Sequence, residues 1–346
     1  MGTNVIIKTN ENGIFQIIEN IRNYPQTPVF TVEDKFPILN YFTFSWLANN
    51  YSFHNLRKEK VKYTQHMERQ FTPFGFIKFV HEKYFIAPAF VLIYILICKY
   101  GHTFMKNKKE IKLKWIIIIW NFLLFFFNMI VAIKLLPVFI YIVNNYTING
   151  LLTIPPIYVC GFGSVGLWIC LFIISKYAEL VDTIFLILKK KKITLLHWYH
   201  HSTVLLYTWD TYFVELPAGF IFILINAFVH TFMYFYYLLA TIYNKPLKWN
   251  ILVTIIQILQ MICGIVLTIY CLYISYIYKY NHNWNINLIQ ELGNNFSFQY
   301  GHYISQKNIF FACLMYLSYF YLFTKYFLNR YTSGIQKDSL LQKKKT

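Results

Sequence analysis

The fold class of this chain is set by residues 115–138, which read WIIIIWNFLLFFFNMIVAIKLLPV. Lys134 is the one charged residue in this stretch, which is longer than the ~20 apolar residues that a helix needs to cross a bilayer. In the whole chain 57% of residues are hydrophobic and 13% are charged, whereas ordinary soluble domains carry about 25% charged residues. The composition therefore predicts an integral membrane protein.

Six more apolar runs lie before and after this one in the chain. The seven predicted spans are Phe85–Lys99, Trp115–Val138, Gly161–Leu188, Ile193–Tyr212, Pro217–Tyr243, Ile251–Tyr280 and Ile309–Phe327. Because these runs approach or exceed the length of a membrane-crossing helix, we expect an all-α integral membrane protein with about seven transmembrane helices.

The placement of the lysines predicts the orientation of the chain. A net charge of +18 can indicate nucleic-acid binding, but the lysines cluster at alternate ends of the predicted spans. The clusters are Lys106–Lys114, Lys189–Lys192, Lys245–Lys248 and Lys343–Lys345. Because cytosolic loops carry the excess of lysine and arginine, we expect a lumenal N-terminus, a cytosolic C-terminus and no nucleic-acid partner.

Two further features agree with this orientation. The glycosylation sequons that begin at Asn50, Asn145 and Asn295 all fall on the predicted lumenal side. The last four residues, 343–346, read KKKT, and a dilysine in this position resembles an endoplasmic reticulum retrieval signal. We expect an endoplasmic reticulum membrane protein in three parts: a lumenal N-terminal extension (1–75), a transmembrane domain (76–330) and a cytosolic basic tail (331–346).

Three histidines stand close together at the start of the fourth span, in LHWYHH at residues 196–201. On a helix His197, His200 and His201 occupy positions i, i+3 and i+4 and share one face. Ionisable residues inside membrane helices are costly and indicate functional sites. Three imidazoles on one face can bind a metal, move protons or attack an acyl group, and the box alone leaves all three open.

Polar residues on neighbouring spans form further stripes. The third span carries Lys176, Glu179 and Asp182, spaced three apart, with Thr183 beside them. The other stripes are on the fifth span (Asn226, His230, Tyr234 and Tyr237) and on the sixth (Thr254, Gln257 and Gln260). A structural role is the alternative: an ion pair for Lys176 with Glu179, and hydrogen bonds between helices for the glutamines.

Helix geometry places these stripes in one layer. At 1.5 Å per residue, Asp182 and His200 each lie roughly 10 Å from the nearest lysine cluster, and His230 lies about 20 Å from the end of its span. Polar groups therefore gather in the cytosolic half, with a more apolar region toward the lumen. We expect a cytosol-facing pocket for a ligand with a polar head and a long apolar tail.

Two other classes of function fit part of this pattern. Membrane di-iron desaturases and hydroxylases also carry an HxxHH box, but they use several such boxes, and none of the other histidines of this chain forms a second one. Because the second histidine box is missing, we expect no bound metal. A seven-span lipid transporter or receptor is the other alternative, but it does not require three histidines beside an acidic stripe.

The four polar motifs together resemble those of the very-long-chain fatty acid elongase (ELO) family. Residues 176–183, KYAELVDT, are similar to its KxxExxDT motif, and 197–201 to its HxxHH box. Residues 226–237, NAFVHTFMYFYY, and 254–260, TIIQILQ, resemble its third motif and its TxxQxxQ motif. The form LHWYHH resembles the branch that acts on saturated and monounsaturated acyl-CoAs. The resemblance implies that the later six spans form a helical barrel.

This resemblance implies an acyltransferase, a 3-ketoacyl-CoA synthase that joins a long-chain acyl-CoA to malonyl-CoA and releases CO2 and CoA. It implies no cofactor beyond these substrates and an environment of membrane lipid. The partners that it implies are the ketoacyl-CoA reductase, dehydratase and enoyl reductase of the elongation cycle, together with further copies of this chain in a homo-oligomer.

The same resemblance implies roles for the motif residues. His200 would be the nucleophile that forms an acyl-imidazole, while His197 and His201 would orient it or move protons. His230 would assist decarboxylation or stabilise the developing enolate. The expected substrate-binding residues are Lys176, Glu179, Asp182, Asn226, Tyr234, Tyr237, Gln257 and Gln260. The lysines of 189–192 and 245–248 would attract the CoA phosphates.

Overall fold

The computed structural model describes residues 8–9, 15–16, 68, 71, 73–153, 161, 163–280 and 304–343. Its helices are α5 (Phe74–Glu82), α6 (Ile86–Met105), α7 (Lys114–Thr153), α9 (Gly163–Ala178), α10 (Val181–Leu188), α11 (Leu195–Phe213), α12 (Gly219–Tyr243), α13 (Asn250–Tyr280) and α15 (Gln306–Lys343). The strands β1 (Lys8–Thr9) and β2 (Phe15–Gln16) pair antiparallel, with Lys8 opposite Gln16. The prediction of a helical fold is confirmed, with this short pair as the exception among the described residues.

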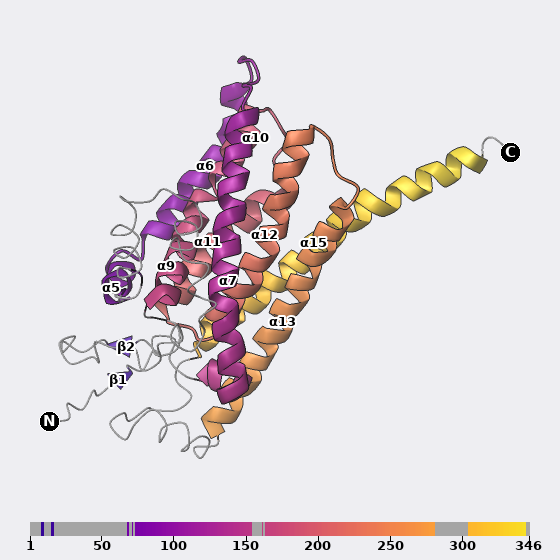
Figure 1. The fold of residues 1–346 in the computed structure, drawn as a ribbon. Helices are drawn as coiled ribbons and strands as arrows, with labels where there is room; N and C mark the ends of the chain where they lie inside the picture. The colour runs from indigo at the N-terminus through magenta and orange to yellow at the C-terminus, as the bar shows by residue number, and fades with distance from the viewer. Residues whose placement is uncertain are drawn as a thin grey trace, which may run out of the picture.

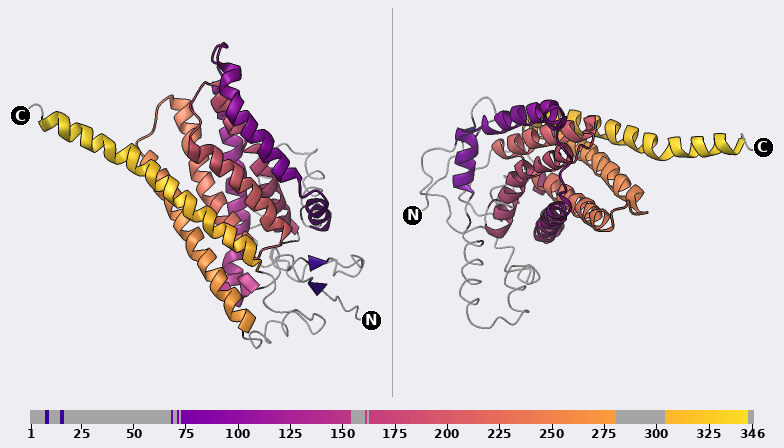
Figure 2. Two further views of the ribbon diagram at one scale, coloured as in Figure 1. Left: turned by 180° about the vertical axis from the view of Figure 1, so that it is seen from behind. Right: turned by 90° about the horizontal axis from the view of Figure 1, so that it is seen from above.

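Six spans close into a barrel (Figure 1), in which α9 and α10 together count as one. Around the ring α7 packs on α12, α12 on α13 and α13 on α15, and the ring then closes from α15 through α11 and α9 back to α7. The remaining span, α6, lies outside the ring against α10 and α11 (Figure 2). The predicted barrel of the later six spans is therefore confirmed.

Five of the described helices are long and apolar enough to cross a membrane: α6, α7, α12, α13 and α15. The other two predicted spans are helical as well. The third is divided into α9, of 16 residues, and α10, of 8 residues. The fourth is α11, of 19 residues, whose apolar character is lowered by the histidine box. The chain is a multi-pass membrane protein.

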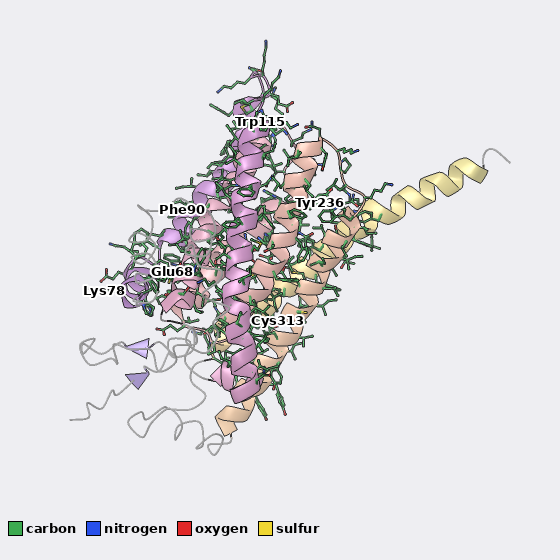
Figure 3. The ribbon with its side chains drawn as sticks, viewed as in Figure 1. Glu68, Lys78, Phe90, Trp115, Tyr236 and Cys313 are labelled. Carbon is green, nitrogen blue, oxygen red and sulfur yellow. The ribbon has the colours of Figure 1, made fainter. Side chains whose placement is uncertain are left out.

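The outer faces of the helices carry large apolar side chains. Trp115 is 75% exposed and Phe90 is 47% exposed (Figure 3). In water such a surface would be a liability, but in a bilayer these side chains contact lipid.

Four spans clearly differ from the predicted ones. Two of them only continue further: α6 ends at Met105, beyond the predicted Lys99, and α15 ends at Lys343, beyond the predicted Phe327. The third does not run unbroken to Leu188, because the helix is interrupted by a turn at Glu179 and Leu180. The second does not end at Val138 but continues as helix through Pro137 to Thr153. Proline removes only one backbone donor, and apolar residues follow it, so continuing the helix leaves fewer unsatisfied backbone groups in an apolar environment than ending it.

The predicted domain boundaries do not coincide with helix ends. Residue 75 lies within α5, and residue 330 lies within α15. The sequons at Asn50 and Asn295 are outside the described residues, as is the tail beyond Lys343, whereas Asn145 lies in α7.

The barrel has two chemically different ends. The lysine end is formed by the start of α7, the start of α13 and the lysines Lys189–Lys192. The α5 end is the opposite one, where α5 packs against α11.

Two helix termini at the lysine end are set by single residues. Asn244 adopts a left-handed conformation, with φ of 53°, and terminates α12. Thr194 begins α11, where its hydroxyl accepts a hydrogen bond from the backbone of His197.

A buried ion pair ties the chain segment before α5 to the barrel. Lys134, which is 2% exposed on α7, lies 3.3 Å from the carboxylate of Glu68 and donates a 2.9 Å hydrogen bond to Ser164 of α9. Ser164 in turn donates to Glu68 at 2.9 Å. Removing either Lys134 or Glu68 would leave the other charge buried without a partner, which costs folding free energy.

We expect Lys134→Ala to lower the free energy of unfolding by about 3 kcal/mol, because it leaves the Glu68 carboxylate without its cation. Denaturation of the purified protein in detergent micelles measures this. The matched control is Lys78→Ala, because the pair of Lys78 with Glu82 is exposed (69% and 56%) and should change stability by no more than about 0.5 kcal/mol. Equal effects of the two substitutions would contradict a structural role for the buried pair.

Candidate active site

Two cavities lie one above the other inside the barrel. The first, the polar cavity, has a volume of about 580 Å³ and lies toward the lysine end. Its lining includes Asp182, His197, His200, His201, His230, Tyr234, Tyr237, Thr254, Gln257, Gln260, Lys189, Lys191 and Arg330.

The second, the apolar cavity, is smaller, at about 100 Å³, and extends toward the α5 end. Its wall consists mainly of apolar and aromatic side chains, among them Ile77, Phe172, Val204, Phe220, Ile223 and Tyr316. The two cavities share three lining residues, His200, Gln260 and Met261. His200 therefore lies where polar space meets apolar space.

The four histidines predicted to be catalytic come together. The ring centroid of His201 is 4.5 Å from that of His197 and 5.4 Å from that of His200. The ring of His230, from α12, lies 6.4 Å from that of His200. All four line the polar cavity.

The ring of His200 is open to both cavities. In the part of the chain that the structure describes, neither of its ring nitrogens is hydrogen-bonded, whereas its backbone carbonyl accepts a 3.2 Å bond from Tyr319. The Tyr319 ring also lies 5.0 Å from the imidazole. His200 is thus held by its backbone and by packing, which leaves its nitrogens available for chemistry.

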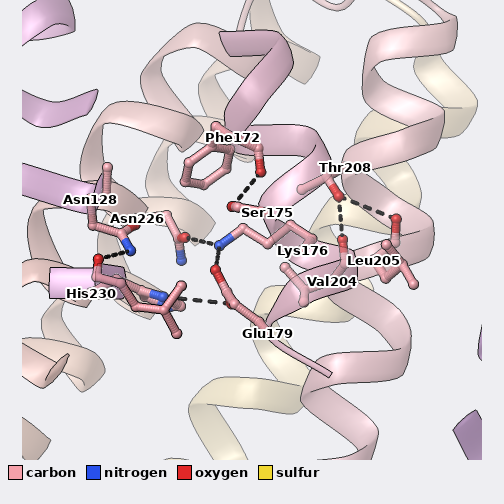
Figure 4. Close-up of polar contacts among 12 residues, drawn as sticks. Asn128, Phe172, Ser175, Lys176, Glu179, Val204, Leu205, Thr208, Asn226 and His230 are labelled. Carbon is pink, nitrogen blue, oxygen red and sulfur yellow. Dashed lines mark hydrogen bonds and ion pairs between the residues drawn. The ribbon is translucent and has the colours of Figure 1, made fainter. Parts of the chain in front are cut away.

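Lys176 and Glu179 form a buried ion pair (Figure 4). Lys176 is 1% exposed, donates to Glu179 at 2.6 Å and donates to Asn226 at 3.1 Å. The other carboxylate oxygen of Glu179 lies 3.8 Å from Nδ1 of His230. Lys176 and Glu179 line neither cavity, so the structure places them behind the site, and only Asn226 of this network reaches the apolar cavity.

Asp182 is in the wall of the polar cavity and is fixed by two hydrogen bonds. Trp120 of α7 donates to one oxygen at 2.6 Å, and Tyr234 of α12 donates to the other at 3.0 Å. The carboxylate thereby connects three helices at one point of the wall.

A chain of hydroxyl groups links His197 to the helix outside the barrel. Nε2 of His197 lies 2.8 Å from the hydroxyl of Thr183, which lies 2.8 Å from the hydroxyl of Tyr94 on α6. Tyr94 is 2% exposed. This chain fixes the position of Nε2 and leaves Nδ1 to the rest of the site. Sequence reasoning did not connect Tyr94 with the site, because a tyrosine among apolar residues gives no signal of its own.

The remaining predicted residues lie in the wall of the polar cavity. Gln257 donates to the sulfur of Met233 at 3.4 Å, and Gln260 borders both cavities. Of the lysines expected to attract phosphate, Lys189 and Lys191 line the cavity, whereas the 245–248 cluster does not.

The described residues contain no group of three or more His, Cys, Asp or Glu side chains placed to hold a metal ion. The histidines of α11 and the nearby carboxylates face different partners, as the hydrogen bonds of Asp182 and Glu179 indicate.

Comparison with known proteins finds one matching family model and several similar proteins from that family. The model of the GNS1/SUR4 (ELO) family matches residues 79–339. The chain is 34% identical to very long chain fatty acid elongase 6 of Drosophila melanogaster over 69% of this chain and 70% of the relative. It is 32% identical to very long chain fatty acid elongase 3 of Homo sapiens (73% and 85%) and 30% identical to fatty acid elongase 3 of Trypanosoma cruzi (71% and 84%).

Sequence reasoning also missed Glu215, which among the described residues is the one carboxylate in the wall of the apolar cavity. It follows the end of α11 with a φ of 49°. Burial raises the pKa of its carboxyl group from 4.5 to about 7. The sequence feature that could have pointed to it is an acidic residue in the short connection between two predicted spans.

We expect Glu215→Gln to stabilise the protein above pH 7. Between pH 4.5 and about 7 the folded protein holds a proton that the unfolded chain has lost, so wild-type stability falls as the pH rises through this window. The melting temperature of the variant in micelles should exceed that of the wild type at pH 8, and the difference should vanish as the pH approaches 4.5. Glu110→Gln, at an exposed position, is the control, and a constant difference at every pH would contradict this assignment.

Proposed function

The chain belongs to the GNS1/SUR4 (ELO) family and is a fatty acid elongase, and we propose that it works through an acyl group carried on His200. As a 3-ketoacyl-CoA synthase it condenses an acyl-CoA with malonyl-CoA. The observation that carries the proposal is the position of His200 in the walls of both cavities.

The two cavities match the two halves of an acyl-CoA. A fatty acyl chain gains free energy from leaving water in proportion to its apolar area, and the apolar cavity offers such a surface. The CoA moiety is polar and anionic, and the polar cavity carries Lys189, Lys191 and Arg330. A substrate that occupies both cavities has its thioester beside His200.

The first half-reaction is acyl transfer to His200. The unprotonated ring nitrogen of neutral His200 attacks the thioester carbonyl, the bond to sulfur breaks, and CoA leaves as a thiolate. The acyl-imidazolium that results then loses the proton of its other ring nitrogen and becomes the neutral acyl-imidazole. A neutral imidazole is a competent nucleophile, and the covalent intermediate divides one difficult step into two easier ones. The open ring nitrogens of His200 suit this role, and His201, 5.4 Å away by ring centroids, is near enough to pass on the proton.

The second half-reaction joins malonyl-CoA to the acyl group. Loss of CO2 from the malonyl group leaves an enolate, whose carbon attacks the acyl-imidazole carbonyl and releases the imidazole. His230 faces His200, with a ring separation of 6.4 Å, and its Nδ1 is directed toward Glu179. A proton on Nδ1 leaves Nε2 of a neutral ring without one, so His230 donates to the developing enolate oxygen as the imidazolium, in which Nε2 also carries a proton.

The buried network has a positioning role in this mechanism. Lys176 holds Glu179 and Asn226, and Glu179 lies beside His230. Asp182, Tyr234, Tyr237, Gln257 and Gln260 then contact the substrate from the wall of the polar cavity. The reaction needs no cofactor, because the thioester and the decarboxylation supply its driving force.

Orientation, location and partners follow from the same proposal. The lysine end faces the cytosol, in agreement with the positive-inside rule. The protein resides in the endoplasmic reticulum as a homo-oligomer, together with the reductases and dehydratase of the elongation cycle.

The box LHWYHH favours saturated and monounsaturated acyl-CoAs as substrates. Condensation rates with a panel of acyl-CoAs of different unsaturation test this preference.

An epitope placed after residue 346 should bind its antibody in sealed microsomes without detergent, because the C-terminus is cytosolic in this orientation. An epitope inserted before residue 8 serves as the control and should bind only after detergent is added. The reverse pattern would overturn the orientation and, with it, access of CoA from the cytosol.

We expect His200→Ala to abolish acyl transfer. Purified wild-type protein incubated with radiolabelled acyl-CoA alone should release CoA and become labelled, whereas the variant should be labelled at least about 10³-fold more slowly, since removal of a nucleophile costs this much or more. His102→Ala is the matched control, because this histidine of α6 lines neither cavity. Size-exclusion chromatography in micelles shows whether the variant is folded, and folded His200→Ala that is labelled at the wild-type rate rules out His200 as the nucleophile.

A further inference from the structure

We propose that α5 sets the maximum length of the acyl chain, with Ile77 as the side chain at which the chain stops. This inference rests on the proposed function, in which the acyl chain extends from His200 into the apolar cavity. It assigns to the segment before the first span a part in substrate selection.

The segment before the first span contributes directly to the wall of the apolar cavity. Pro73 and Ile77 both line it, and Ile77 is only 3% exposed. The other described lining residues belong to the barrel helices or to the segments that join them. The cavity is thus completed by an element that is not part of the ring.

Packing places α5 far from His200. Phe76 contacts Trp209 and Tyr212, with centroid distances of 6.3 and 5.0 Å, and His81 lies 4.3 Å from Phe213. These partners follow His200 on α11 by 9 to 13 residues, which is roughly 14–20 Å along the helix at 1.5 Å per residue. A chain that starts at His200 therefore meets α5 only after it has passed along the cavity.

A stop must be rigidly held, and α5 is held on two sides. On one side aromatic rings pack it against α11. On the other, the chain just before it is bound through the ion pair of Glu68 with Lys134 and through a 3.0 Å bond from the backbone N–H of Gly163 to the carbonyl of Phe71. Glu68 lies next to the barrel in Figure 3. Displacing α5 would separate a buried ion pair, which costs several kcal/mol.

The two faces of α5 supply a matched control. Pro73, Ile77 and Val80 are buried and lie on one face, at positions i, i+4 and i+7, whereas Lys78 and Glu82 are exposed. Val80 is 0% exposed, yet it does not line the cavity. Trimming Val80 therefore loosens the packing of α5 without enlarging the cavity, while trimming Ile77 does both.

The test measures condensation rates of purified variants with malonyl-CoA and a panel of acyl-CoAs that differ by two carbons. For Ile77→Ala we expect the ratio of the rate with the next longer substrate to the rate with the wild-type optimum to rise about tenfold, since one methylene in an apolar pocket discriminates by this much or more. For Ile77→Trp we expect the optimum to shift to shorter chains. Val80→Ala should keep the wild-type profile.

A further variant separates this inference from the proposed function. Val204→Trp introduces bulk one helical turn from His200, in the same cavity, and should suppress condensation of every long acyl chain. If Val204→Trp shortens the profile but Ile77→Ala leaves it unchanged, or if Val80→Ala shifts it as much as Ile77→Ala does, the role of α5 is overturned while the proposed function stands. If Val204→Trp has no effect on folded protein, the acyl chain does not enter this cavity and the proposed route fails.

Discussion

The ion pair between Lys176 and Glu179, 2.6 Å long and closed off from solvent, constrains the site more than any other contact. In a low-dielectric interior neither charge is tolerable without the other, so the turn that ends α9 is fixed in place. The same lysine holds Asn226, and the same carboxylate lies beside His230, both on α12. One ion pair thereby sets the distance between the third and fifth spans, and hence the position of His230 opposite His200.

The break between α9 and α10 is what makes this arrangement possible. A continuous helix would keep Lys176, Glu179 and Asp182 on one narrow stripe. With the turn at Glu179 and Leu180, the first two residues remain buried behind the wall, while Asp182 is directed into the polar cavity, where Trp120 and Tyr234 hold it. The interruption separates a supporting pair from a carboxylate that reaches the substrate.

The elements outside the barrel are connected to its chemistry as well. From α6, Tyr94 reaches His197 through the hydroxyl of Thr183. From the segment before α6, Ile77 completes the apolar cavity, and Lys134 anchors that segment through Glu68. Nε2 of His197 and the wall of the apolar cavity are thus fixed by partners on other helices, as expected where a reactive geometry must be maintained.

The sequence by itself determined the helical membrane fold, the approximate positions of the seven predicted spans, and the histidine box and its neighbours, because hydropathy and helical periodicity are local properties. It failed to predict two features that depend on distant parts of the chain. The turn at Glu179 is held by Lys176, which also bonds Asn226 on α12, and the helix through Pro137 depends on its apolar surroundings. Only the tertiary structure decided which polar residues reach a cavity, that Tyr94 and Glu215 belong to its surroundings, and that α5 completes the wall. These outcomes depend on contacts between residues far apart in the chain, to which no local pattern responds.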